Sequence, residues 1–499
     1  MIEGLVSATA QVLTWPGPAF IILGVAVGLV VGVLPGIGGA GATALMIPIT
    51  YAMEPEHAIA FLFAVATSSG LGGQITAILV NIPGDPPNAA TTLDGYPMTR
   101  AGRAAEALGA ATFGSIIGAV FGMAMLLAVL PLARNIVLAF SYPEFFMIAI
   151  SGLVMIATLT RGQTYKGLIA GGVGLLLAFI GLDPINGNPR FTFGQLYLWD
   201  GIDIVPALVG LFAGAEMLSL YSTRGSASIV ESTIERRQST LLDGVRSTIR
   251  HWRTVVVSSI VGFLVGLVPG LGGTVASFMA YGQAARMSKH PEQFGHGAVE
   301  GVIAAETAND ADKGGGLLPT IAFGIPGGTL MAVLLAGLLL HGVPIGPQLL
   351  RGDLHIVYVL VVSSLIPRFL AAIVVLAVGA RAIVITRLRG DVLAPVISVV
   401  SLIGVYAVNN EVRDVVLALA FAYVGYAMER NGFSRIALVI ALVLGGLVEA
   451  SLHQTLGTFG IGGFVTRPIS LGLLAVTLVA LLGPLVRRRI QTAGMAGAA

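Results

Sequence analysis

Long apolar segments separated by short polar ones dominate the chain. A membrane-spanning helix needs roughly 17 to 25 apolar residues to cross a hydrocarbon core of about 30 Å. Predicted spans of about this length are 104–131, 143–160, 164–182, 203–221, 353–380, 391–408, 414–428, 433–451 and 469–486. Segments at 18–34, 37–53 and 57–81, and again between 254 and 341, are equally apolar but are broken or closely joined. The pattern predicts an all-α polytopic membrane protein with broken or re-entrant helices and about 11 to 13 membrane segments.

Composition excludes a soluble globular protein. Hydrophobic residues make up 56% of the chain and charged residues 10%, and the mean hydropathy is +0.91. A soluble domain has about 25% charged residues. The absence of cysteine excludes disulfides, thiolate metal sites and cysteine nucleophiles. The first residues carry no basic run and no small-residue cleavage site, so we expect no removable signal peptide.

One broken segment occurs twice. Residues 28–39 and 262–273 share seven identical positions, namely Gly28, Val31, Gly32, Pro35, Gly36, Gly38 and Gly39 in the first copy. A second break follows in each half, at residues 81–84 and 324–327, and each is followed by a segment that we interpret as a loop, at 94–97 and 341–344. The sequence therefore contains an internal duplication. Paired, interrupted hydrophobic segments in two halves indicate the binding site of a transporter.

The distribution of basic residues predicts that the two repeats have opposite orientations. We divide the chain into a first membrane repeat (1–221), a cytoplasmic connector (222–253) and a second membrane repeat (254–499). Loops predicted to be cytoplasmic hold 18 Lys and Arg residues, whereas loops predicted to be external hold four. The C-terminus is expected in the cytoplasm and the N-terminus outside. Inverted repeats allow alternating-access transporters to open one midplane site to either face.

The breaks provide candidate ligands from the backbone. Proline and glycine leave amides and carbonyls without intrahelical partners; the amides suit an anion and the carbonyls a cation. The alternative is that these glycines only allow helices to pack closely. The candidate substrate- or ion-binding residues at the breaks are Pro35, Gly36, Gly38, Gly39, Asn81, Gly84, Pro269, Gly270, Gly272, Gly273, Gly327, Gly328 and Thr329.

Polar residues precede the second break of each half and extend the candidate site. They are Ser68, Ser69 and Gln74 in the first half and Asn309, Asp310 and Lys313 in the second. Their hydroxyls, amides and charges fit a carboxylate or a sodium ion. The alternative for the stretch from 306 to 313 is a polar loop at the membrane surface.

Lys313 has two possible roles. If the stretch is helical, Glu306, Asp310 and Lys313 share one face, and Lys313 either pairs with Asp310 or binds an anionic substrate. We favour the pair with Asp310, because an unpaired charge at membrane depth is costly. Arg368, inside another apolar span, is interpreted as structural.

Motifs for catalysis are missing from the sequence. The seven histidines lack metal-ligand spacing, and the chain has no HExxH, no nucleophile elbow and no phosphate-binding loop of the GxxxxGK type. We therefore expect no catalytic residue, no metal site, no organic cofactor and no nucleic-acid partner. A nucleotide-driven pump is disfavoured for the same reason.

The chain resembles the large membrane subunit, TctA, of the tripartite tricarboxylate transporter family. The resemblance covers nearly the whole chain and is carried by P-G-I-G-G, N-I-P-G-D-P-P, T-T-L-D-G-Y-P-M, E-T-A-N-D-A-D-K-G-G, G-I-P-G-G and H-G-V-P-I-G-P. It implies a transporter in the bacterial inner membrane that takes carboxylates from a periplasmic binding protein and works with a small membrane subunit. It also implies an ion gradient as the driving force, usually of sodium.

We expect an ion-coupled symporter for a small organic carboxylate of the di- or tricarboxylate type, with Na⁺ or H⁺ as the coupling ion. This chain departs from the family's E-A-A-N-N-A by carrying Asp310, Asp312 and Lys313, and from a common G-G-S by carrying Gln74. The substrate and the coupling ion therefore stay open. The alternative function is a gated channel or facilitator for organic anions.

Overall fold

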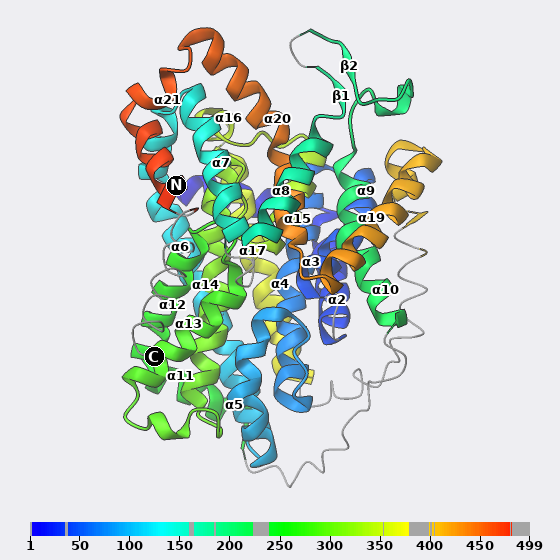
Figure 1. Ribbon diagram of the computed structural model, residues 1–499. Coiled ribbons are helices and arrows are strands. Elements are labelled where there is room, and N and C mark those ends of the chain that lie inside the picture. Colours follow the sequence, from blue (N-terminus) through cyan, green and yellow to red (C-terminus); the bar gives the residue numbers. More distant parts are fainter. Residues whose placement is uncertain are drawn as a thin grey trace, which may run out of the picture.

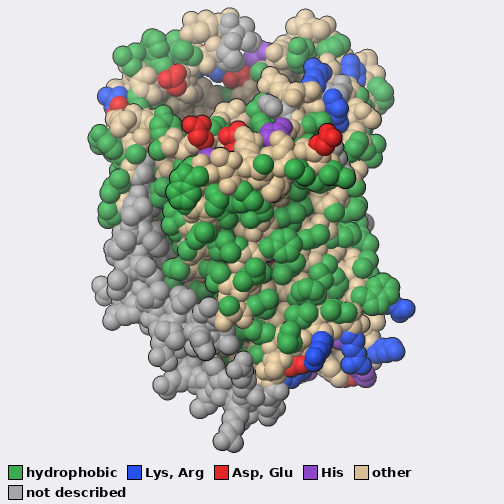
Figure 2. All heavy atoms as spheres, turned by 180° about the vertical axis from the view of Figure 1, so that it is seen from behind, with side chains coloured by type: hydrophobic (Ala, Val, Ile, Leu, Met, Phe, Trp, Pro, Cys, Tyr) green, Lys and Arg blue, Asp and Glu red, His purple; other side chains and the backbone are tan. Residues whose placement is uncertain are grey.

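The computed structural model describes residues 2–34, 38–158, 164–183, 186–222, 239–352, 354–378 and 405–479, with residues 399, 402, 403 and 481. This part of the chain is almost entirely helical, and its one small sheet pairs two short antiparallel strands (Figure 1). Figure 2 shows a broad band of hydrophobic side chains around the middle of one face, with charged side chains gathered at its two ends. The predicted all-α membrane architecture is confirmed.

The first half, up to residue 222, contains α1 (Ile2–Val12), α2 (Gly17–Val33), α3 (Gly38–Met46), η1 (Pro48–Ala52), α4 (Pro55–Val80), η2 (Pro86–Asn88), α5 (Ala89–Arg100), α6 (Ala104–Leu138), α7 (Tyr142–Thr158), α8 (Thr164–Ala178), β1 (Gly181–Leu182), β2 (Pro189–Arg190), η3 (Leu196–Leu198), α9 (Ile204–Leu208), the π-helical segment η4 (Val209–Gly214) and α10 (Ala215–Ser222). In the sheet, Gly181 is opposite Arg190 and Leu182 is opposite Pro189.

The remainder contains α11 (Leu241–Arg250), α12 (Trp252–Gly266), α13 (Gly272–Met287), η5 (Pro291–Gln293), α14 (Val299–Phe323), α15 (Thr329–Leu340), α16 (Pro347–Gly352), α17 (Leu354–Val378), α19 (Val412–Arg430), α20 (Arg435–Thr458) and α21 (Gly463–Thr466). Among the described residues, α4, α6, α17 and α20 are long and apolar enough to cross a bilayer, and α1 with α2 forms a fifth candidate that is bent by 81°. Several helices of 10 to 17 residues are also apolar. The predicted number of segments stays a prediction.

The duplicated breaks interrupt helices in both halves. Helices α2 and α3 are separated at residues 34–37, of which 35–37 lie outside the described residues, and α12 and α13 are separated at 267–271. Helix α4 ends at Asn81 and α14 ends at Gly324, and both capping residues have left-handed backbone conformations. The order α2, α3, α4, α5 therefore matches the order α12, α13, α14, α15.

The two halves exchange equivalent contacts. Helix α6 packs along α14 while α17 packs along α4, and α5 contacts α13 while α15 contacts α3. In Figure 1, α5 lies at the lower end of the bundle, whereas α15 leads toward α16 near the upper end. Helices α5 and α15, which follow the second break of each half, thus extend toward opposite ends of the bundle, as an inverted repeat requires.

Several local predictions are corrected. The segment 94–97 is not a loop, because α5 continues through Pro97 to Arg100. The side chain of Asp94 accepts backbone hydrogen bonds from Gly295, Gly297 and Ala298, so contacts with the other half hold this segment helical despite the proline. Helix α1, the small sheet and the π-helical segment had not been predicted. Most of the predicted span 391–408 and much of the connector lie outside the described residues.

The connector and the β1–β2 hairpin provide a test of membrane orientation. Arg246 in α11 and Asn188 beside β2 are exposed, and α11 and the β1–β2 hairpin lie near opposite ends of the bundle (Figure 1). Because the native chain lacks cysteine, we expect Asn188→Cys to react with an impermeant thiol reagent on intact cells, and Arg246→Cys to react only after permeabilisation. Reaction of Arg246→Cys, but not of Asn188→Cys, on intact cells would overturn the predicted orientation.

Candidate functional site

Helix α14 is the buried centre of the candidate site. All of its residues from Gly301 to Ala322 are buried, and its neighbours α6, α12 and α13 belong to both halves. The stretch from 306 to 313 is therefore not a polar loop at the surface, which was the alternative interpretation. Its charged side chains need partners within the protein, because burial without a partner is costly.

Asp310 forms the central contact of this helix. Its Oδ1 atom accepts hydrogen bonds from Lys313 Nζ, one turn further along α14, and from Arg368 Nη2 on α17. All three side chains are buried. The expected pairing of Lys313 with Asp310 is thus present, and Arg368 is the partner that the sequence did not identify. Two cations share one carboxylate, whose Oδ2 atom has no hydrogen-bond partner among the described residues.

Asp85, in the second break of the first half, lies close enough to Lys313 for their charges to interact. Its carboxylate accepts a hydrogen bond from the backbone amide of Gly39 at the start of α3. A Cβ atom added at Gly38 would lie 3.0 Å from Asp85 Oδ1, and one added at Gly70 would lie 3.7 Å from Lys313 Nζ. Lys313 therefore stands between a carboxylate of its own helix and a carboxylate of the other repeat.

In the second half, the two breaks touch each other directly. The amide of Gly270, which follows Pro269, donates a 2.9 Å hydrogen bond to the carbonyl of Gly327. A Cβ atom added at Gly273 would lie 2.5 Å from Asn309 Oδ1, and one added at Gly272 would lie 3.4 Å from the Cα atom of Gly328. The predicted residues of the second half are thus brought together around the start of α13 and of α15, where Thr329 is the first helical residue.

Other predicted residues are placed differently. Ser68 and Ser69 are buried on α4, and their hydroxyls have no hydrogen-bond partner among the described residues. Gln74 points away from the breaks and donates a 2.8 Å hydrogen bond to Thr112 on α6. Asn81 is exposed, and Gly84 packs against the backbone of α2. Pro35 and Gly36 lie outside the described residues.

A buried carboxylate, that of Glu306, forms a second polar centre one turn before Asp310. It accepts a 2.9 Å hydrogen bond from Asn88 Nδ2 in η2, another from Thr91 on α5, and a longer one of 3.4 Å from Ser115 on α6. These partners all come from the first repeat. Hydropathy alone had not identified them, because single polar residues in apolar segments usually serve helix packing.

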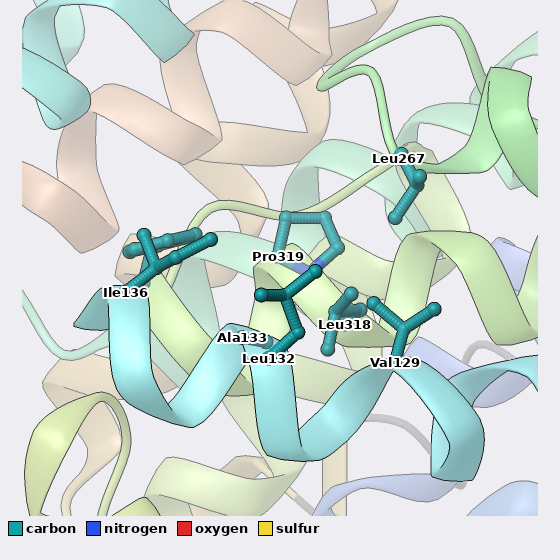
Figure 3. Close-up of a pocket in the computed structure, with 8 residues that line it drawn as sticks. Val129, Leu132, Ala133, Ile136, Leu267, Leu318 and Pro319 are labelled. Carbon is teal, nitrogen blue, oxygen red and sulfur yellow. The ribbon is translucent and has the colours of Figure 1, made fainter. Parts of the chain in front are cut away.

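The two best-formed pockets are apolar and lie outside the charged centre. One, of about 180 Å³, lies between α6, α14 and Leu267 and is lined by hydrophobic side chains that include Leu318 and Pro319 (Figure 3). The other, of about 290 Å³, lies between α3, η4 and α19. Their lining side chains are hydrophobic, and the phenol of Tyr423 in the second pocket is the one polar group among them. Within the described residues, no group of three or more His, Asp and Glu side chains is arranged to hold a metal ion.

The arrangement can bind an anion through side chains and backbone together. Lys313 and Arg368 are positive groups whose present partner is a carboxylate, and a guanidinium suits carboxylate geometry. The first turns of α13 and α15 add amides and the positive ends of helix dipoles. Asp85 could have been selected from the sequence, because it follows the duplicated proline and glycine directly.

Charge balance in this cluster predicts the order of stability among variants. Lys313→Met leaves Asp310 paired with Arg368, whereas Asp310→Asn leaves two buried cations next to each other. We expect Asp310→Asn to lower the thermal unfolding temperature of the purified protein more than Lys313→Met does, since removal of one partner from a buried pair costs roughly 3 to 5 kcal/mol. The double variant, which leaves Arg368 alone, should also be less stable than Lys313→Met. Equal stability of all three would contradict the shared ion pair.

Gly272 provides a test of the break geometry. Its φ of +62° is strained for a residue with a side chain, and most strained for a β-branched one. We expect Gly272→Val to insert into the membrane but to lose most uptake, because strain of about 1 to 3 kcal/mol would distort the start of α13. Gly172→Val on α8, where an added Cβ meets no atom within 4 Å, is the control. Normal uptake by Gly272→Val would favour the packing alternative.

Comparisons with known proteins agree with this architecture. The family model described as the tripartite tricarboxylate transporter TctA family matches residues 19–440. An uncharacterized 52.8 kDa protein in the TAR-I ttuC' 3' region of Agrobacterium vitis is 34% identical over 471 residues, which cover 91% of this chain and 90% of that protein. An uncharacterized protein in the TAR-II ttuC' 3' region of the same organism is 32% identical over 225 residues, covering 44% of this chain and 92% of that protein. No solved structure matches the chain.

The matched region contains both copies of the broken helices and the whole charged cluster on α14. The family consists of transporter components and not of enzymes. This chain belongs to the tripartite tricarboxylate transporter TctA family and is a component of such a transporter.

Proposed function

We propose that this chain is the ion-coupled translocation subunit of a symporter that imports a small organic carboxylate across the bacterial inner membrane. A periplasmic binding protein delivers the substrate, and a small membrane subunit completes the complex. The coupling ion is Na⁺ or H⁺. The C-terminus is cytoplasmic and the N-terminus is periplasmic. Family membership supports the class of transporter, and the charged cluster supports an anionic substrate.

The observation that carries the proposal is the shared carboxylate of Asp310. Two buried cations at membrane depth would each cost roughly 2.5 to 3.5 kcal/mol without a partner. Asp310 pairs with both Lys313 and Arg368 while the site is empty, so one negative charge is shared between two cations. A substrate carboxylate takes over one of these cations, and each cation then has a carboxylate partner of its own. A second carboxylate of the substrate binds the amides at the start of α15, whose cap Gly328 has no side chain.

Contacts that join α5 and the end of α15 to the opposite repeat support an alternating-access mechanism. Asp94 on α5 binds the backbone of the loop before α14. His341, at the end of α15, hydrogen bonds at 2.8 Å to Thr50 in η1, which precedes α4. Helices α5 and α15 therefore each contact the opposite repeat, at opposite ends of the bundle. Release of one contact at a time opens the central site to one side of the membrane.

Reconstitution tests the coupling. In proteoliposomes that contain this chain, the small subunit and a loaded binding protein, we expect concentrative uptake of the bound carboxylate only with an inward Na⁺ or H⁺ gradient. Omission of the binding protein should abolish uptake. Equal uptake without any ion gradient, ceasing at equal internal and external concentrations, would instead support the gated channel.

A further inference from the structure

The Glu306 carboxyl group is buried and surrounded by neutral donors. Its residue is 1% exposed, and its hydrogen bonds come from one amide, that of Asn88, and two hydroxyls, those of Thr91 and Ser115. The donors lie on η2, α5 and α6 of the first repeat, whereas Glu306 lies on α14 of the second. The carboxyl group is thus located in the contact between the repeats.

The described residues place no cation in hydrogen-bonding contact with Glu306. Arg368 and Lys313 both donate to Asp310 instead, so Glu306 feels an attractive charge from Arg368 and a repulsive one from Asp310. Of the other charged side chains nearby, Asp94 binds backbone amides, Glu106 pairs with Arg103, and Glu300 contacts His251. Asp312, on the same helix as Glu306, is also buried, and its Oδ1 atom has no hydrogen-bond partner among the described residues. An ionised carboxylate in this position receives hydrogen bonds only from neutral groups, and a neutral carboxylic acid avoids the cost of burying the charge.

Counting hydroxyl protons shows that the network has room for one more proton. Ser115 Oγ lies 3.4 Å from Glu306 Oε2 and 3.5 Å from Gln74 Oε1, yet its hydroxyl has one proton to donate. When Glu306 is ionised, Ser115 can donate a hydrogen bond to only one of these two acceptors. With a proton on Glu306 Oε2, the acid donates to Ser115 and Ser115 donates to Gln74. The chain then continues from Gln74 Nε2 to Thr112 on the next turn of α6.

We propose that Glu306 is a proton-binding site of this transporter. The proton is held on Oε2 and is not transferred to another group while the two repeats stay in contact. The consequence is that H⁺ is a coupling ion, and this consequence rests on the proposed transport function. Ionised Glu306 holds Asn88 and Thr91 through charge-assisted hydrogen bonds, which are stronger than neutral ones. Protonation weakens both hydrogen bonds and so weakens the contact of η2 and α5 with α14.

Infrared spectroscopy tests the site without any substrate. The purified chain is titrated from about pH 5 to about pH 9, the range that buried carboxyl groups can reach. We expect the spectrum of wild type minus that of Glu306→Gln to contain a carbonyl band of a protonated carboxylic acid that disappears as the pH rises. Other carboxyl groups, including the buried Asp312 on the same helix, are present in both proteins and cancel in this difference. Glu300→Gln, on the same helix, is the control and should retain the band. A titration that is identical in wild type and Glu306→Gln would overturn the proposal.

Transport by the reconstituted complex tests the consequence. Radiolabelled citrate and succinate are supplied with their binding protein, with and without an inward proton gradient. We expect the gradient to stimulate uptake by wild type and by Glu300→Gln, and Glu306→Gln to lose the stimulation while it still exchanges internal for external substrate. Stimulation of equal size in Glu306→Gln would overturn a role in coupling. If wild type carries neither carboxylate, the proposed function fails for these substrates, whereas the infrared titration still decides the proton site.

Discussion

A charge at membrane depth needs a partner inside the protein, and Asp310 meets this need for two cations at once. Its contacts with Lys313 and Arg368 join α14 to α17, and the interaction of Lys313 with Asp85 extends the cluster to the first repeat. The broken helices depend on the same constraint, since their free backbone groups are tolerated only where protein or a polar cavity surrounds them. The cluster and the breaks therefore occupy one buried region.

Duplication provided the backbone of this region, and divergence provided its chemistry. The equivalent caps of α4 and α14, Asn81 and Gly324, set the correspondence between the two helices. In this alignment Thr67 corresponds to Asp310, Ser69 to Asp312 and Gly70 to Lys313. At these three positions the charges lie in the second copy, and Gly70 of the first copy lies beside the lysine. A symmetric frame thus holds an asymmetric site, in which one repeat provides most of the charge and the other provides hydroxyls and amides.

Hydropathy and the repeated breaks were sufficient to predict the helical architecture, because apolar length and proline–glycine interruptions act locally. The pairing of Lys313 with Asp310 followed from helical spacing for the same reason. Partners from distant segments could not be predicted in this way. Arg368 lies 58 residues from Asp310, and Asn88 lies 218 residues from Glu306. Gln74 was selected for its position near a break, and its amide donates to Thr112 on α6; its role as a ligand stays a prediction.

Asp94 and His341, the first residues of the corresponding sequence segments 94–97 and 341–344, make contacts of different strength. Asp94 Oδ1 accepts three backbone hydrogen bonds of 2.8 to 3.0 Å, in which the acceptor is a carboxylate. His341 makes one bond, to the hydroxyl of Thr50. Hydrogen bonds to charged groups contribute roughly 1.5 to 3 kcal/mol each, against about 1 kcal/mol for neutral ones. The contact made by Asp94 is therefore stronger than the contact made by His341, and the inverted symmetry of the backbone does not make corresponding contacts of the two repeats energetically equal.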